Sequence, residues 1–343
     1  MNKLKFGTTL FLLTLVIFLL FSYRDFLWTY RSMLEDYFSY YHYQDQIVFY
    51  QLGDEKYKDY IPVNTRFLGL ILQYIIFNVV PCLKLNHLTI VNQYPIYECA
   101  TFSLAFLNYV CKYLFIIYAF LYVKKTTSNI SISLISIILT YIFFLYLESF
   151  SFDRLAVLYV LICLYYEDKK YISNPLLILS FLVNEKVIMV LGPYYLFQYI
   201  KNKNKVNFKK VFLILLSTVF YIFMIFILTK FYGYSFHPYY NDVGFYRIIL
   251  DLTNKSHISN SVLPFIFVLI PYITLLYTKK HYNLRNSKLE ILIPFVLWFL
   301  SYGGGENNIG RYVMHTLPLW LPLLSSQLYN LFFYNEKVSN NNI

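Results

Sequence analysis

The chain has few charged residues for its length. Asp, Glu, Lys and Arg make up 14% of its 343 residues, whereas a soluble domain carries about 25%. It has only four cysteines, and these show no CxxC or zinc-ligand spacing. P-loop, GxSxG and HExxH motifs are also missing, so ATP-driven transport and the common hydrolase chemistries have no support in the sequence.

Apolar sequence is what the chain has in excess. Hydrophobic residues make up 58% of it, and the mean hydropathy is +0.50. Several apolar runs approach or exceed about 20 residues, the length that crosses a bilayer as a helix. These properties predict an all-α, polytopic integral membrane protein in which residues 1–343 form a single transmembrane domain.

The lysines set the orientation of the predicted spans. The net charge is +11, and most basic residues lie in short loops between apolar runs. Such residues mark cytoplasmic loops that face anionic membrane lipids, so nucleic acid is not expected as a partner. If successive apolar runs cross the membrane in alternating directions, the chain has about ten spans. It is then a multi-pass protein of the inner (plasma) membrane. Both termini, including the tail 334–343, are in the cytoplasm. Residues 22–95 and 233–260 then form external loops.

One apolar segment is treated differently. The segment from Phe67 to Val80 is 14 residues long, which is short for a span. If it crossed, the next span would carry Lys124 and Lys125 to the outside, so we predict an interfacial helix in the first external loop. The spans are then predicted at residues 6–21, 96–123, 130–147, 155–166, 175–183, 187–200, 211–231, 262–278, 291–302 and 313–333.

The cysteines are expected to be free. Cys111 and Cys163 lie within apolar runs and are predicted to be small buried hydrophobic residues. Cys82 and Cys99 both fall on the predicted outer side, where they could meet, but no disulfide is expected between them.

Acidic residues gather on the predicted outer side. Seven of the eighteen carboxylates fall between Asp25 and Asp59, and the positive-inside rule does not require this. Sugar transfer to a hydroxyl uses a general base and often a metal ion that steadies the phosphate leaving group. Glu35, Asp36 and Asp45 are the candidates for these roles, and the alternative is that they are ordinary solvated surface acids.

A second group of candidates lies in the sequence GGGENNIGRY, residues 303–312. Its three glycines allow a ligand to approach the backbone closely. Arg311 is suited to grip a phosphate with two parallel hydrogen bonds, and Glu306 precedes it by five residues. The alternative is a tight turn that carries an interfacial arginine.

Two adjacent acid–base pairs occur at predicted outer span ends. Asp153–Arg154 is interpreted as a local ion pair at the interface. Glu185–Lys186 is flanked by short spans, which let polar residues sink into the membrane, and ionisable residues at such depth are functional candidates. His315 is expected to pack or hydrogen-bond within the last span.

The order of these features resembles the GT-C superfamily of membrane glycosyltransferases. A first span is followed by an external acid, Asp45-Gln46, then by Tyr50, and then by Arg66 at the start of a short interfacial helix. Some bacterial members show an Asp-Gly-Gln-x-Tyr-like element, of which this chain lacks the glycine. Asn184-Glu185-Lys186 and the ending Gly310-Arg311-Tyr312 resemble further elements of related proteins.

The resemblance implies a GT-C-like hexosyl- or pentosyltransferase. It would move a sugar from a polyprenyl-phosphate-linked donor to an acceptor glycan or lipid on the external face, with Mg²⁺ or Mn²⁺ as the cofactor that the family allows. The role of base or metal ligand falls to Asp45, with Glu35 and Asp36 competing for it. The resemblance implies substrate binding by Arg66, Glu185, Lys186, Arg311, Glu306 and Tyr50.

Two other functions stay open. The Asp153–Arg154 stretch and the span after it also resemble polysaccharide (O-antigen or exopolysaccharide) polymerases of the EpsG/Wzy type, in which arginines would matter more than a carboxylate. A lipid-linked oligosaccharide flippase or other transporter would place charges along a central cavity. The predicted topology instead gathers them at one face.

Overall fold

The computed structural model describes residues 66–82, 95–144, 152–231 and 315–333, together with Leu27, Tyr30, Ile293 and two short strands. The described part is helical, as predicted, apart from these strands. β1 (Tyr60–Ile61) pairs in parallel with β2 (Ser235–Phe236). The sequence did not predict this small pairing, which joins the two segments that were expected to be external loops.

The helices agree closely with the predicted apolar segments. The short segment expected at residues 67–80 is α3, and every predicted span within the described ranges coincides with a helix, which in most cases also takes in flanking polar residues. The helices are α3 (Phe67–Val79), α4 (Pro95–Thr127), α5 (Ile130–Phe144), α6 (Asp153–Tyr165), α7 (Lys170–Leu179) with the 3₁₀ turn η5 (Ser180–Leu182), α8 (Glu185–Asn202), α9 (Lys205–Phe231) and α14 (Leu317–Phe333).

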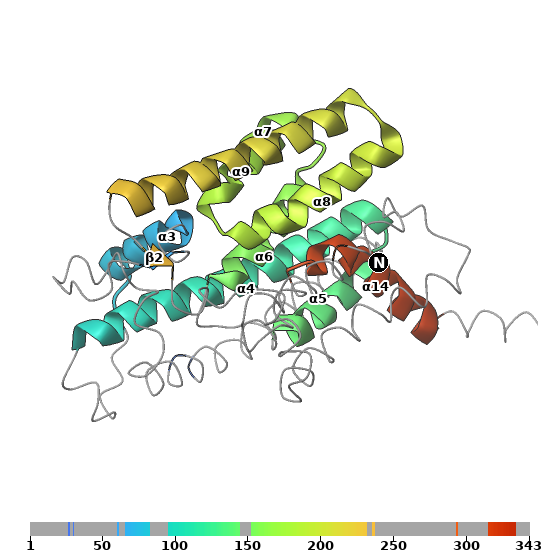
Figure 1. Cartoon of the computed structure of the whole chain (residues 1–343). Helices are drawn as coiled ribbons and strands as arrows, with labels where there is room; N and C mark the ends of the chain where they lie inside the picture. Colours follow the sequence, from blue (N-terminus) through green and yellow to red (C-terminus); the bar gives the residue numbers. More distant parts are fainter. Residues whose placement is uncertain are drawn as a thin grey trace, which may run out of the picture.

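α4 runs through the middle of the bundle, with α6 packed along it (Figure 1). α8 and α9 form a hairpin on one side, and α7 packs against α9. α5 and α14 lie on the other side and pack against each other and against α4. Apolar side chains from these layers are fully buried where they meet, among them Phe115, Val157, Leu191 and Leu321.

Two helical hairpins use the same turn chemistry. Ser128 follows α4 and Lys203 follows α8, and both adopt a left-handed backbone, with φ of 54° and 43°. The next residue, Asn129 or Asn204, accepts a hydrogen bond of 2.9 Å or 2.7 Å from a backbone N–H in the first turn of the following helix. A left-handed residue ends the first helix and an asparagine N-cap starts the second, so each reversal is tight.

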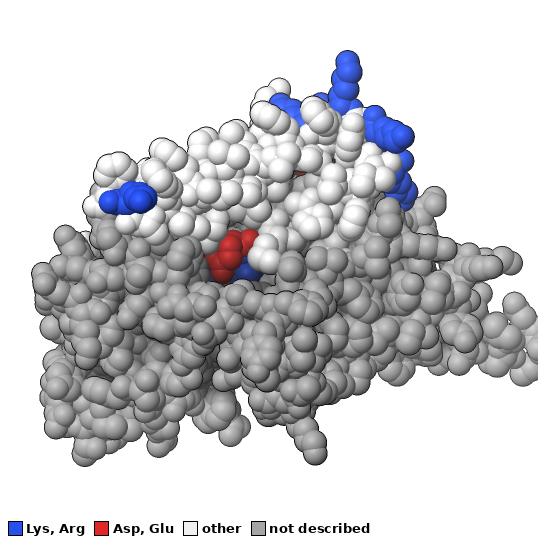
Figure 2. Space-filling model, viewed as in Figure 1, with Lys and Arg blue, Asp and Glu red and all other residues white. Residues whose placement is uncertain are grey.

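These hairpins gather lysines at one end of the bundle. Ion pairs of 2.9 Å, Lys125–Asp168 and Lys210–Glu167, tie the neighbouring helix ends together there. Figure 2 shows basic side chains collected where α8 turns into α9. We call this the lysine end, and its exposed lysines are Lys124, Lys125, Lys169, Lys170, Lys201, Lys203, Lys205 and Lys209.

The opposite end carries a disulfide. Cys82, which follows α3, is bridged to Cys99 near the start of α4, and their Cα atoms are 5.3 Å apart. The prediction that these two cysteines stay free was wrong, because α3 packs back against α4 and brings them together. Cys111 and Cys163 are free and buried, as predicted.

Among the described residues, two helices are long and apolar enough to cross a membrane. They are residues Phe102–Thr127 of α4 and the whole of α9. The predicted spans at 6–21, 262–278 and 291–302 lie outside the described residues, except for Ile293.

Candidate functional site

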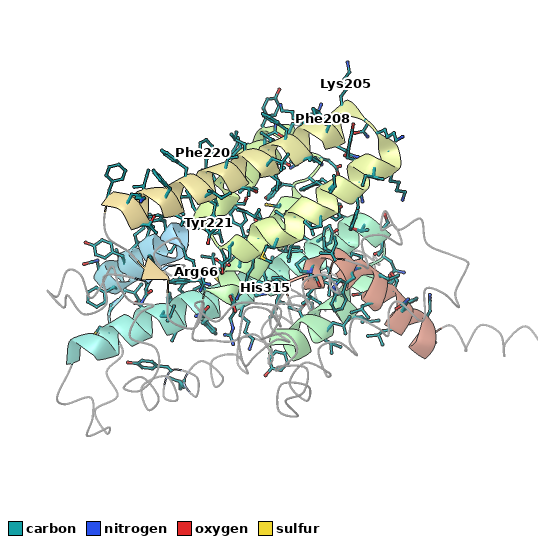
Figure 3. The ribbon with its side chains drawn as sticks, in the orientation of Figure 1. Arg66, Lys205, Phe208, Phe220, Tyr221 and His315 are labelled. Atoms are coloured by element: carbon teal, nitrogen blue, oxygen red, sulfur yellow. A yellow bond between two sulfur atoms is a disulfide. The ribbon has the colours of Figure 1, made fainter. Side chains whose placement is uncertain are left out.

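Three predicted site residues lie in the described part, and the structure brings them together. Arg66, Glu185 and Lys186 meet on the side of the bundle away from the lysine end. Figure 3 shows Arg66 and His315 in this region, well away from Lys205. The other predicted residues lie outside the described ranges: Glu35, Asp36, Asp45, Tyr50, Glu306 and Arg311.

The first contact of the site joins α3 to α8. Arg66 immediately precedes α3, and its Nη2 donates a hydrogen bond of 2.8 Å to Oε1 of Glu185, the first residue of α8. The Arg66 side chain is 6% exposed and that of Glu185 21%. Glu185 also lies in the first turn of α8, where the partial positive charge of the helix N-terminus favours a carboxylate. The pair therefore fastens the beginning of α3 to the beginning of α8.

The second contact joins α8 to α6. Lys186 Nζ lies 3.0 Å from Oδ1 of Asp153, the first residue of α6, and both side chains are buried. The sequence had suggested a local pair between Asp153 and Arg154, whereas this pairing of Asp153 runs between helices. Desolvating two charges is costly, so such a pair persists only where its geometry is good.

His315 meets the same carboxylate. It lies just ahead of α14, it is fully buried, and its Nε2 is 3.4 Å from Oδ1 of Asp153. This contact across the bundle was not predicted, because His315 was expected to interact within its own span.

We call Arg66, Asp153, Glu185, Lys186 and His315 the charged cluster. Each member lies at or just before the start of a helix. The side chain of Asn184 caps α8 by accepting a hydrogen bond of 3.0 Å from the backbone N–H of Lys186. Successive residues on a helix point about 100° apart, so the capped first turn directs Glu185 toward α3 and Lys186 toward α6.

α3 lies directly over the beginning of α6. A Cβ atom placed on Gly69 would come within 2.6 Å of the ring of Phe152, the residue before Asp153. Phe152 is itself buried. Only glycine lets α3 approach this closely, and the approach places Arg66 within reach of Glu185.

The charge of Glu185 is maintained by its neighbours. Burial by itself raises the pKa of the Glu185 carboxyl, but the charges of Arg66 and Lys186 and the hydrogen bond from Arg66 outweigh it. The pKa is therefore held below its ordinary value of 4.5, and Glu185 is ionised at neutral pH. Glu185 precedes the apolar part of α8, which begins at Val187.

The cluster is set well apart from the lysine end. Asp153 precedes Tyr165 by twelve residues of α6, and the Tyr165 carbonyl accepts a 2.7 Å hydrogen bond from Lys125. Lys186 precedes Lys201 by fifteen residues of α8. At 1.5 Å per residue, these helices place the cluster about 18–22 Å from the lysines.

The residues of the cluster do not make a divalent-metal site. Within the described ranges, no group of three or more His, Cys, Asp or Glu side chains gathers. Mg²⁺ and Mn²⁺ bind through oxygen ligands such as carboxylates, but the carboxylates of Asp153 and Glu185 each face a cationic side chain. The cation implied by the resemblance is therefore not assigned to these residues.

Sequence reasoning found Glu185 and Lys186 through the short apolar runs that flank them, and Arg66 through its place before an apolar segment. It considered Asp153 and His315 but assigned neither to the site. The usable signal was that both are ionisable residues at a predicted outer span end.

In three comparisons with known proteins, the chain matched no family model, no curated protein and no solved structure.

Proposed function

We propose that the chain is a multi-pass membrane protein of about ten spans whose charged cluster faces the external side. The exposed surface of α9 supports this proposal. Large apolar side chains such as Phe212, Val219 and Phe223 are more than half exposed along a helix of 27 residues. In water this surface would be an aggregation hazard, and in a bilayer it faces lipid.

Two ends of different chemistry support the orientation. Lysines near spans favour the cytoplasmic side, whereas disulfides such as Cys82–Cys99 form in oxidising compartments outside the cytoplasm. A cluster about 18–22 Å from the lysines then lies at the outer ends of the predicted spans, since a hydrocarbon core is about 30 Å thick. In this arrangement both termini are cytoplasmic and the predicted acidic loop is external.

The proposed activity is a GT-C-like glycosyl transfer from a polyprenyl-phosphate-linked sugar to a glycan or lipid acceptor. The observation that carries it is the meeting of Arg66 and Lys186 with two carboxylates, from three separate helices, at the proposed external end. Buried charge in a membrane protein is costly and marks sites that handle polar ligands. An arginine and a lysine in the same cluster suit the phosphate of a lipid-linked sugar.

The proposed reaction is a direct displacement. The acceptor oxygen forms a bond to the anomeric carbon of the sugar, and the bond from that carbon to the phosphate oxygen breaks. The lipid phosphate leaves with the electron pair, held by Arg66 and Lys186 together with Arg311. Asp45, or Asp36 beside Glu35, accepts the proton of the acceptor hydroxyl, while Tyr50 and Glu306 line the sugar. The configuration at the anomeric carbon is inverted.

Transfer assays test this function. Membranes from cells that produce the chain are incubated with polyprenyl phosphates that carry a radiolabelled hexose or pentose, and label in the acceptor is counted. We expect transfer to fall at least about tenfold in Arg66→Ala and Lys186→Met, since each removes a phosphate contact. Lys230→Gln is the matched control, because Lys230 is an exposed lysine outside the cluster. Equal activity in all four proteins would refute the assignment of the site.

A polysaccharide polymerase is the second candidate. Two arginines, Arg66 and Arg154, are buried in the described bundle, at 5% and 6% exposure, as expected where arginines rather than a carboxylate dominate. Transfer that survives Asp45→Asn and Asp36→Asn but is lost in Arg311→Ala favours the polymerase. Uptake of lipid-linked sugar into vesicles, with no effect of any variant on transfer, favours a transporter.

A further inference from the structure

The turn between α8 and α9 concentrates positive charge. Lys201, Lys203, Lys205 and Lys209 are all exposed. The sequence contains no acidic residue between Lys186 and Asn241. The turn is therefore a compact cationic surface (Figure 2).

The backbone of this turn is held in one shape. Lys203 is left-handed, and its N–H donates a 2.6 Å hydrogen bond to the carbonyl of Tyr199. The buried side chain of Asn207 donates a 3.1 Å hydrogen bond to the carbonyl of Gln198, across the turn. The first contact closes the end of α8 and the second ties α9 back to α8, so the backbone that carries the lysines is fixed.

The neighbouring acids are engaged elsewhere. Glu167 accepts from Lys210 at 2.9 Å and from the hydroxyl of Tyr194 at 3.3 Å. Asp168 pairs with Lys125 at 2.9 Å. These two acidic side chains at the lysine end thus form ion pairs with lysines outside the turn. Because they do not neutralise the four lysines of the turn, the turn keeps its positive potential.

An apolar stripe begins at the same turn. Phe208 and Phe220 point outward from α9, and Phe208 lies close to Lys205 (Figure 3). Exposed side chains recur every three or four residues along one face of α9, which is the spacing of a continuous helical stripe. It extends over about 27 Å. We call it the α9 stripe, and its residues are Phe208, Phe212, Leu215, Val219, Phe223 and Phe226.

We propose that the turn and the α9 stripe together bind an anionic phospholipid, with its phosphate among the four lysines and an acyl chain along the stripe. Such a lipid brings a negative charge to the lysines of the turn and an apolar chain to the α9 stripe. A second copy of the chain packed side by side in the membrane would bring two cationic turns together at the same depth, and their repulsion disfavours that occupant. An uncharged lipid would cover the stripe but leave the lysines without a counter-charge.

Thermal unfolding of the full chain, purified in an uncharged detergent, tests this proposal. We expect phosphatidylglycerol to raise Tm, because a ligand that binds only the folded state stabilises it. Phosphatidylcholine with the same acyl chains and inorganic phosphate should leave Tm unchanged. The variant with Lys201, Lys203, Lys205 and Lys209 all changed to Gln should lose the shift. Phe208→Ala with Phe212→Ala should reduce it, and Lys230→Gln should keep the full shift.

Further variants keep the test decisive. If the fourfold Gln variant fails to fold, the milder Lys203→Gln with Lys205→Gln should reduce the Tm shift by half or more, and the fourfold change to Arg should retain it.

The proposal is overturned if phosphatidylcholine raises Tm as much as phosphatidylglycerol does, or if the Gln variants keep the full shift. Inorganic phosphate that works as well as the lipid would assign a free-anion site instead. A dimer that dissociates in Phe212→Ala would assign the stripe to a second copy. The test is independent of glycosyl transfer.

Discussion

Arg66 and Glu185, 119 residues apart in the sequence, form an ion pair of 2.8 Å at the beginnings of α3 and α8. The next residue, Lys186, turns to a different helix and pairs with Asp153 at 3.0 Å. Two neighbouring residues of opposite charge thus bind two different helices. This crossed pairing fixes α3, α6 and α8 relative to one another at one end of the bundle.

The Arg66–Glu185 pair predicts a pH-dependent stability. Because the pKa of Glu185 is lower in the folded state, its contribution is fully present above the unfolded value of 4.5 and is lost as pH falls through the lower folded value. We expect Glu185→Gln to lower Tm at pH 7 and to match the wild type at a pH below both values. Thermal unfolding in detergent across this range measures it, with Lys230→Gln as the control. A Tm of Glu185→Gln that is lower than that of the wild type by the same amount at both ends of the pH range would contradict the prediction.

The buried Lys186–Asp153 pair predicts that the two residues depend on each other. Lys186→Met should destabilise the fold by about 3 kcal/mol or more, because Asp153 is left buried without its lysine. Asp153→Asn should cost a similar amount. The double variant should recover a large part of the loss, which chemical unfolding of all four proteins measures as a double-mutant cycle. Losses that simply add would show that the pair is not coupled.

Replacing Gly69 by alanine is expected to cause a steric clash, and the same replacement at Gly192 serves as the control. Gly69→Ala places a methyl group 2.6 Å from the ring of Phe152, so α3 must shift away from α6. We expect a loss of about 1–3 kcal/mol, as in other overpacked cores, and weaker phosphate binding by Arg66. At Gly192 the nearest atom to an added Cβ is 3.5 Å away, on Ile214, so Gly192→Ala should be tolerated. Similar behaviour of the two variants would argue against the close approach of α3.

The Cys82–Cys99 disulfide leads to two predictions, one about the stability of the fold and one about the side of the membrane on which it lies. It closes a loop with a sequence separation of 17 residues, for which chain entropy gives about 3 kcal/mol. Cys82→Ser with Cys99→Ser should lower Tm, and a reductant should lower Tm of the wild type but not of this variant. After reduction of intact cells, a membrane-impermeant maleimide should label these cysteines from outside. Labelling only after the cells are broken would reverse the proposed orientation.

Much of the helical frame could be predicted from sequence. Apolar length located α3 through α9 and α14, and Ser128-Asn129 and Lys203-Asn204 follow an ordinary turn chemistry. Glu185 and Lys186 were identified because ionisable residues between short apolar runs are unusual, and Arg66 because it precedes the short apolar segment in the order that the resemblance describes. Their partners could not be predicted, because a contact between helices depends on the rotation and depth of each helix.

The remaining differences have similar causes. The Cys82–Cys99 bridge depends on the way α3 folds back on α4, and the contact of His315 depends on where α14 packs. Neither follows from the local sequence. The candidate base residues Asp45, Asp36 and Glu35 lie outside the described residues, so their assignment stays a prediction.

The distance in sequence between Arg66 and Glu185 has a consequence for biogenesis. A ribosome that adds about 5–20 residues per second reaches Glu185, the first residue of α8, roughly 6–24 s after it has made Arg66. During that interval the guanidinium of Arg66 has no Glu185 to bind. The ion pair that fastens α3 to α8 can therefore form only after α4, α5, α6 and α7 have been made.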